Sequence, residues 1–248
     1  MAGALEILSR VHDALRREPI IEAASHVILL DFEDGVLTIE GEVGSIAAKK
    51  LALERAAAQR GVSALVDRLH FARARSMTDD EIRSHTCEML AAELAFFECT
   101  ILSRERGRVE VVRTAVVSSQ WTIEVSVDEG VVTLDGDAPS LAHKRLAGVM
   151  AFWVPGSRDV VNGLGVLPPE EDSDEEVNEG VRLALEKDPF LDAVDIRSTV
   201  QRRVVTLRGV AHSDAQKEMA EMDAWAVFGV DFVVNELVVR EARAQPQI

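Results

Sequence analysis

The chain carries the same pattern of glycine and leucine three times. In each copy a second glycine follows the first after 20 residues, and a leucine follows it after 28. The three sets are Gly41, Gly61 and Leu69; Gly136, Gly156 and Leu164; and Gly209, Gly229 and Leu237. Because self-similarity at fixed spacings is the mark of a repeated structural unit, we expect three related units in this chain.

Each copy predicts a β-hairpin before its first glycine. Two apolar, β-rich runs are separated there by a short turn, which contains Asp34-Gly35 in the first copy and Glu129-Gly130 in the second. The third copy has Gln201-Arg202-Arg203 instead, without glycine, so we expect a looser turn. We also expect the first glycine of each frame to end the second strand of its hairpin.

A helix and a third strand are predicted after the hairpin. Ser45, Ser140 and Ser213 stand four residues after the first glycines and are suited to cap a helix that runs to the second glycine. Three matching alanines, on one face of that helix, are expected to be buried: Ala56, Ala151 and Ala224. Three matching lysines are expected to stay in solvent: Lys49, Lys144 and Lys217.

A helix is also predicted before each hairpin, which gives an α+β fold of three tandem α-β-β-α-β units. We place the units at residues 1–76, 77–167 and 174–240, with an acidic linker at 168–173 and a tail at 241–248. The second unit contains an insertion, residues 98–117, whose alternating apolar runs predict an added β-hairpin.

These features resemble the BON domain family, the bacterial osmotic-stress and nodulation modules. The resemblance rests on Val131-Thr133-Leu134-Gly136 with Asn162 and Leu164, and on Val205-Thr206-Leu207-Gly209 with Asn235 and Leu237. The first copy departs from the motif, since Asp67 stands where the asparagine is expected. The resemblance implies a binding module associated with phospholipid surfaces and envelope stress protection and, in a cytoplasmic relative, with potassium.

Composition limits the classes of partner. A formal net charge of −16 repels nucleic-acid phosphates and anionic lipid headgroups, so we expect no nucleic-acid partner. No apolar run is long enough to cross a bilayer, and residues 1–15 lack the basic start and apolar core of a signal peptide. We therefore expect a cytoplasmic protein without a transmembrane segment.

Residue types that carry chemistry are present but scattered. Cys87 and Cys99 lack a neighbouring Cys or His at metal-ligand spacing, which favours two reduced, packed thiols. The six histidines do not recur at one position of the frame. No phosphate-binding glycine motif follows a predicted strand. We expect no metal site, no cofactor and no catalytic residues.

Four aromatic residues are the candidate surface for a ligand or partner. Phe152 and Trp153, and Trp225 and Phe228, lie near the end of the second helix in the second and third copies. They could equally fill the core or the contact between repeats, and packing is the commoner role for such residues. The expected function is a non-enzymatic, stress-related interaction protein that binds a lipid, a small ligand or an ion, or serves as a protein scaffold. The alternative is an enzyme whose site forms between repeats.

Overall fold

The computed structural model describes residues 3–19, 21, 28–71, 77–117 and 120–240. The chain divides into two compact units, Met1–Ala74 and Arg75–Ile248. The first therefore ends close to the boundary expected at residue 76, and the second contains both segments expected at 77–167 and 174–240. The expected tail, residues 241–248, lies outside the described residues.

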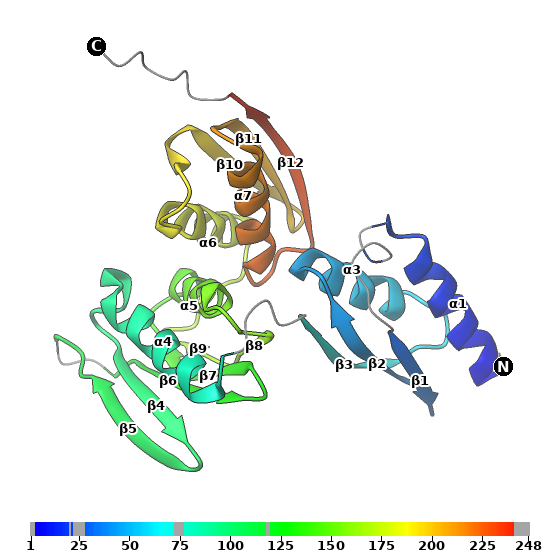
Figure 1. Cartoon of the computed structure of the whole chain (residues 1–248), viewed down its shortest axis with the longest axis horizontal. Helices are drawn as coiled ribbons and strands as arrows, with labels where there is room; N and C mark the ends of the chain where they lie inside the picture. Colours follow the sequence, from blue (N-terminus) through cyan, green and yellow to red (C-terminus); the bar gives the residue numbers. More distant parts are fainter. Residues whose placement is uncertain (1–2, 20, 22–27, 72–76, 118–119, 241–248) are drawn as a thin grey trace. The chain divides into compact units, whose positions relative to one another are not determined.

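The first unit has a three-stranded sheet with two helices packed on it (Figure 1). Its middle strand pairs antiparallel with the strand before it and parallel with the strand after it. The elements are α1 (Ala4–Arg16), β1 (Leu29–Glu33), β2 (Val36–Val43), α3 (Ile46–Ala57) and β3 (Ala64–Phe71). This is the predicted α-β-β-α-β order.

The second unit contains the same order twice, with additions. Its first half comprises α4 (Asp79–Ala92), the 3₁₀ turn η1 (Leu94–Phe96), β4 (Thr100–Glu105), β5 (Arg108–Arg113), β6 (Thr122–Asp128), β7 (Val131–Ala138), α5 (Leu141–Trp153), β8 (Asp159–Asn162) and β9 (Gly165–Val166). Its second half comprises α6 (Asp174–Lys187), η2 (Ala193–Asp195), β10 (Ile196–Gln201), β11 (Val204–Ala211), α7 (Asp214–Ala226) and β12 (Phe232–Val239). Mixed helices and strands make the fold α+β, as predicted.

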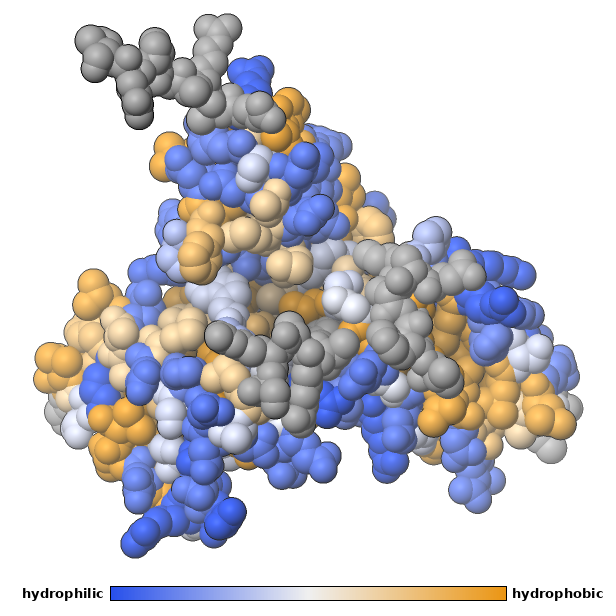
Figure 2. All heavy atoms as spheres, viewed as in Figure 1, coloured by the Kyte–Doolittle hydropathy of each residue, from blue (hydrophilic) through white to orange (hydrophobic). Residues whose placement is uncertain are grey.

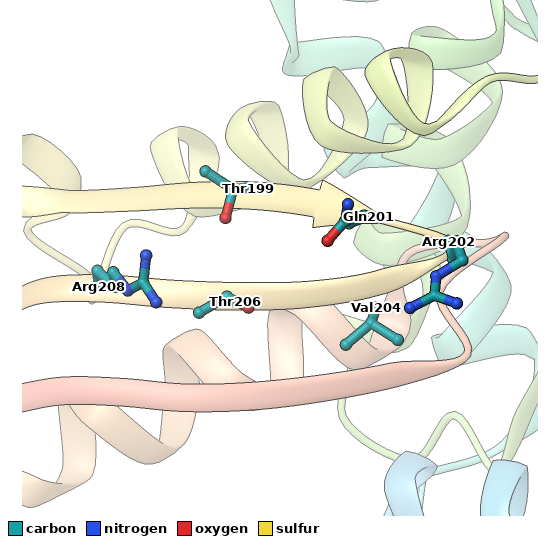
Figure 3. A pocket seen from close by; sticks show the side chains of 6 residues that line it. All are labelled: Thr199, Gln201, Arg202, Val204, Thr206 and Arg208. Carbon is teal, nitrogen blue, oxygen red and sulfur yellow. The ribbon is translucent and has the colours of Figure 1, made fainter.

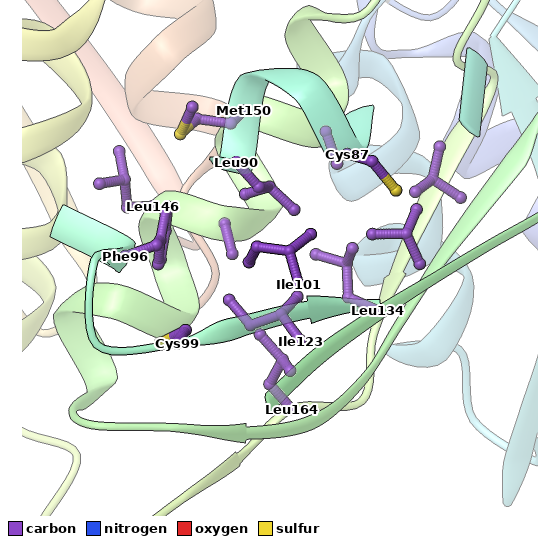
Figure 4. Packing of buried hydrophobic residues seen from close by; sticks show 14 of the residues in the cluster. Cys87, Leu90, Phe96, Cys99, Ile101, Ile123, Leu134, Leu146, Met150 and Leu164 are labelled. Atoms are coloured by element: carbon purple, nitrogen blue, oxygen red, sulfur yellow. The ribbon is translucent and has the colours of Figure 1, made fainter. Parts of the chain in front are cut away.

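The predicted extra hairpin is present. Strands β4 and β5 pair antiparallel around a turn at Arg106 and Gly107, and β4 pairs parallel with β6. The insertion thereby extends the sheet to the order β5-β4-β6-β7-β8, with β9 also paired to β7. The core beneath this sheet is formed by apolar side chains from α4, η1, α5 and the inner strands, including Leu90, Phe96 and Leu134 (Figure 4).

The first glycine of each frame does not end its strand, contrary to expectation. Strands β2, β7 and β11 each continue two residues beyond it, and the glycine has a positive φ of 149°, 113° or 126°. In the second and third copies the backbone comes very close at the first residue of the preceding strand or at the residue just before it. A Cβ on Gly136 would lie 2.2 Å from the Thr122 carbonyl oxygen, and one on Gly209 1.9 Å from that of Asp195. Glycine is therefore required inside the strand.

The hairpin turn that belongs to the repeat has, in all three copies, two central residues with positive φ, which is the conformation of a type I′ turn. The third turn, Arg202-Arg203, has this tight geometry without glycine, so the prediction of a looser turn is wrong. The Asp174 carboxylate holds this turn in place, because its two oxygens accept hydrogen bonds from the backbone N–H groups of Arg202 and Arg203, at 2.5 and 3.0 Å. These bonds offset the strain of a left-handed arginine pair.

The predicted helix caps are confirmed. The hydroxyls of Ser45, Ser140 and Ser213 each accept a hydrogen bond from the backbone three residues ahead. The three alanines expected to be buried, Ala56, Ala151 and Ala224, have no exposed surface. Small side chains at these positions let the second helix lie close to the sheet.

The prediction that the matching lysines stay in solvent is wrong for Lys49. That side chain is buried, donates a hydrogen bond to the Leu69 carbonyl at 2.8 Å and pairs with Asp67 at 2.9 Å. Lys217 makes the equivalent bond to the Leu237 carbonyl, also at 2.8 Å. Because strand carbonyls lie within reach of the ammonium group, burying the lysine stem does not leave its charge without a partner.

We predict that Gly209→Ala lowers the free energy of unfolding more than Gly107→Ala does. Both glycines have positive φ, which costs an alanine about 1–2 kcal/mol. A Cβ on Gly107 meets nothing within 4 Å, whereas one on Gly209 collides with the Asp195 carbonyl. Urea unfolding of both variants separates the two contributions, and equal losses would contradict the requirement for a close strand approach.

Candidate binding surfaces

The four aromatic candidates lie where the two halves of the second unit meet, but they do not form one exposed surface. The Trp153 indole, on α5, donates a hydrogen bond to the Asp223 carboxylate on α7 at 2.8 Å. Trp225 is buried and packs edge-on against Phe232, with ring centroids 5.6 Å apart. Phe228 is 53% exposed, and Phe152 is partly buried. Trp153 therefore joins the two halves and Trp225 packs within the second half, and the ligand role of all four residues stays a prediction.

Arg145 fills the centre of this contact. It is 1% exposed, and its guanidinium donates to the carbonyls of Phe228 at 2.9 Å and Glu176 at 3.4 Å. It also pairs with the Asp172 carboxylate, which accepts a second hydrogen bond from Arg203 at 3.1 Å. A buried arginine needs such a set of partners, since an unpaired charge at this depth would be strongly destabilising. Asp172, in the segment expected to be a linker, thus joins both halves.

Two buried carboxyl groups stand at the other end of the contact. Asp223 is 4% exposed and Asp188, which ends α6, is 7% exposed. Burial raises the pKa of Asp223 to about 8, the Trp153 hydrogen bond opposes the rise, and the neighbouring Asp188 carboxylate adds to it. Asp188 is held by the backbone N–H of Phe190 at 2.8 Å. Nearby, Lys187 at the end of α6 pairs with Glu93 after α4 at 2.6 Å.

The three-stranded sheet of the second half has one face without helices. Helices α6 and α7 cover the other face, where Val205 and Leu207 of β11 are fully buried. On the uncovered face lies a shallow hollow of about 570 Å³ (Figure 3). Thr199 and Gln201 of β10 and Thr206 and Arg208 of β11 line it, with Arg202 at the turn end. A neighbouring hollow of about 530 Å³ shares three of these residues and adds others, which include Arg197 and Asp195.

The uncovered face is suited to anionic groups. Arginine guanidinium groups bind carboxylate and phosphate oxygens through paired N–H donors, and threonine hydroxyls add single donors. Arg208 already pairs with Glu236 across the strands at 2.6 Å, but both side chains are largely exposed, so this bond contributes little. Arg197 and Arg202 are exposed, and neither side chain has an acidic partner among the described residues. Figure 2 shows hydrophilic and hydrophobic residues interspersed over the visible surface.

The other residues weighed for chemistry do not converge. Both cysteines are buried and free, and burial raises the pKa of each thiol to about 11, which disfavours the reactive thiolate. Among the described residues, no three His, Cys, Asp or Glu side chains are placed to share a metal ion. His143 contacts the Ser140 hydroxyl at 2.6 Å, but that hydroxyl caps α5 and burial lowers the histidine pKa. Within the same ranges, no helix has the length and apolarity needed to span a bilayer.

Sequence reasoning missed Arg145, Asp223 and the three arginines of the uncovered face. The copies themselves contain a weak signal for Arg145, since Lys50 and Glu218 occupy its position in the other frames. A residue that differs so strongly between copies cannot serve the shared fold. Arg197, Arg202 and Arg208 alternate along two predicted strands or stand in their turn, so their common face could have been inferred from strand periodicity.

Comparison with known proteins identifies the family. The family model of the BON domain matches residues 108–168 and 173–241, which together make up more than half of the sequence, and the chain belongs to this family. The matched segments run from β5 to just past β9 and from just before α6 to just past β12. They confirm two copies of the expected domain; residues 1–76 are not matched.

Two solved structures show a distant likeness. Both are of CdsD, a structural protein of the type III secretion system of Chlamydia trachomatis. Its C-terminal domain is 12% identical, with 96% of this chain and 100% of that chain covered and a TM-score of 0.24. A second CdsD structure is 14% identical, with 96% and 93% covered and a TM-score of 0.25. These values place no constraint on function. No curated protein matches the sequence.

We predict that Asp223→Asn makes the protein more stable than the wild type at pH 8.5. The folded-state pKa of Asp223 lies above its ordinary value of 3.8, so the folded state holds a proton that the unfolded state loses. The wild type should therefore lose stability as the pH rises from about 4 to about 8. Asparagine still accepts the Trp153 hydrogen bond without carrying a charge, and should recover about 1–3 kcal/mol.

Urea unfolding at pH 5 and pH 8.5 measures this effect. The exposed Asp231 provides a control, because Asp231→Asn changes the same charge away from the buried pair. Equal dependence on pH in the wild type and Asp223→Asn would contradict the assignment.

Proposed function

We propose that this chain is a non-enzymatic interaction protein whose uncovered β10–β11–β12 face binds the anionic oxygens of a ligand. The observation that carries the proposal is the hollow with Arg202 at one end and Arg208 at the other, and with the hydroxyls of Thr199 and Thr206 between them. Membership of the BON family supports a binding role over catalysis.

The charge of the chain makes this face selective. At a net charge of −16, an anion is repelled by most of the surface and is attracted only where guanidinium groups gather. Salt screens such attraction between exposed groups, and the Debye length is about 8 Å at physiological ionic strength. The proposed complex is therefore weak, local and sensitive to salt.

We also propose that residues 1–76 are a third, diverged BON-like copy. Its α-β-β-α-β order, its type I′ turn at Asp34-Gly35 and its parallel third strand match those of residues 77–167 and 174–240, which overlap the two matches of the family model. The boundaries at 76, 167 and 174 follow from this assignment. A role in stress responses, which the family resemblance implies, is part of the same proposal.

Anionic oxygens can come from an acidic protein segment or from a phospholipid headgroup, and we favour the protein segment. The hollow is open and shallow, and its floor is two hydrogen-bonded strands, so it presents a flat surface on which an extended segment could lie. A bilayer of anionic lipid would meet the acidic remainder of the chain as well as this face, which adds repulsion.

We predict that a hexaglutamate peptide shifts the backbone amide signals of Thr199 and Thr206 in an NMR titration of the full chain. The shifts should shrink as salt is raised. The double variant Arg197→Ala, Arg202→Asn should weaken binding several-fold, because it removes two positively charged guanidinium groups and their N–H donors. Asparagine is chosen at position 202 because it tolerates the positive φ of 50° found there.

Arg182→Ala serves as the matched control. Arg182 is also an exposed arginine of the third copy, but it lies on α6 and pairs with Glu179 and Glu186 on the same helix. Its loss should leave the titration unchanged. Binding to phosphatidylglycerol vesicles without binding to hexaglutamate would favour the headgroup, and no response to either would refute the proposed function.

A further inference from the structure

The first residue of the first helix is not the same in the three copies. Each second glycine contacts an apolar residue of the first helix: a Cβ on Gly61 would meet Ile7, one on Gly156 would meet Ile82, and one on Gly229 would meet Val177. These three residues are therefore structurally equivalent. Three positions before them, where each helix begins, stand Ala4, Asp79 and Asp174 respectively.

In the second and third copies this aspartate binds the turn. The Asp79 carboxylate accepts hydrogen bonds from the backbone N–H groups of Glu129 and Gly130, at 2.9 and 2.8 Å. The Asp174 carboxylate does the same with Arg202 and Arg203. These backbone bonds lower the pKa of Asp174. Two adjacent amides of a type I′ turn thus form a receptor for the two oxygens of one carboxylate.

In the first copy the two turn amides are present, but the helix has no aspartate to bind them. The turn residues Asp34 and Gly35 have φ values of 48° and 86°, close to the 49° and 80° of Glu129 and Gly130. The methyl group of Ala4 cannot accept a hydrogen bond. The residue before this helix is Gly3, which has no side chain to cap it, whereas Thr78 and Ser173 cap the helix from the same position in the other copies.

A hollow of about 890 Å³ lies at this place. It is lined by residues of the hairpin, of α1 and of the segment after α3: Phe32, Asp34 and Gly35; Glu6, Ile7 and Arg10; and Arg60 and Gly61. The acidic Glu6 bonds to Arg10. Arg10 is fixed there by hydrogen bonds to the Arg60 carbonyl at 2.6 Å and to Glu6 at 3.0 Å. Arg60 is exposed, and its guanidinium has no acidic partner among the described residues.

We propose that this hollow of the first unit binds the carboxylate of a ligand, at the place that Asp79 and Asp174 occupy in the other copies. The amides of Asp34 and Gly35 hold the two oxygens, Arg60 supplies the opposite charge, and Phe32 contacts the body of the ligand. The acidic side chain of Asp34 does not prevent this, since Glu129 is acidic at the same position and its amide still binds Asp79.

An NMR titration of the full chain with sodium acetate, at constant ionic strength against sodium chloride, tests the proposal. We expect acetate to shift the amide signals of Asp34 and Gly35. Ala4→Asp should abolish this response, because its carboxylate takes the place of the ligand. Leu5→Asp is the matched control: it adds the same charge to the same helix turn from a side chain that is 84% exposed, and should keep the response.

The reverse exchange gives an independent test. Asp174→Ala should make the amide signals of Arg202 and Arg203 respond to acetate, as the first copy does in the wild type. The absence of an acetate response at Gly35, or its persistence in Ala4→Asp, would overturn the proposal. The Arg197→Ala, Arg202→Asn variant should leave the response of Gly35 intact, which separates this site from the uncovered face of β10–β12.

The source of the carboxylate is distinguished by peptides. Acetyl-Ala-Ala with a free C-terminus is compared with its C-terminal amide and with succinate. Stronger binding of the free peptide than of succinate assigns the site to a chain terminus, and the reverse order assigns it to a small organic acid. The amide should not bind, and a response to it equal to that of the free peptide would also overturn the proposal.

Discussion

The close approach of the first strand to a glycine of the middle strand sets the geometry of the repeat. In the second and third copies a carbonyl oxygen of the preceding segment occupies the space that any side chain at Gly136 or Gly209 would need. The middle strand can therefore continue beyond the glycine and pair on both sides. On its other side, Gly41 lies opposite Leu69 and Gly209 opposite Leu237 in the parallel ladder. The 28-residue spacing of the sequence is thus a strand register.

A second constraint, the burial of Arg145, acts between the halves of the second unit. Its guanidinium needs several acceptors, and it obtains them from Asp172 and from carbonyls of α6 and of the segment after α7. The acidic segment before α6 is therefore part of the contact and not only a connection. Trp153 and Asp223 extend the same contact, so this tryptophan, one of the four aromatic candidates, is committed to packing between the halves.

The extent to which the sequence predicts this structure depends on the range of the interactions. The hairpins, the serine caps and the buried alanines follow from local spacing, and all were predicted. The position of the glycine inside the strand was not predicted, because it depends on a backbone carbonyl that comes from another segment of the hairpin. Lys49 was wrongly assigned to solvent for the same reason, since its acceptor, the Leu69 carbonyl, comes from the third strand. The Arg145 contact combines four separate segments, and no spacing in the sequence predicts it.

The repeated units also show how one backbone can present different chemistry. The hairpin turn has nearly the same conformation in all three copies, yet its central residues are Asp34-Gly35, Glu129-Gly130 and Arg202-Arg203. In the third copy an aspartate from the helix satisfies the turn amides, the Arg203 side chain bonds to Asp172, and the Arg202 side chain is exposed. In the first copy the amides themselves face the hollow, because Ala4 replaces that aspartate. The two proposals thus assign anion binding to side chains in the third copy and to the backbone amides of the turn in the first, where both the residue that starts the helix and the turn residues differ.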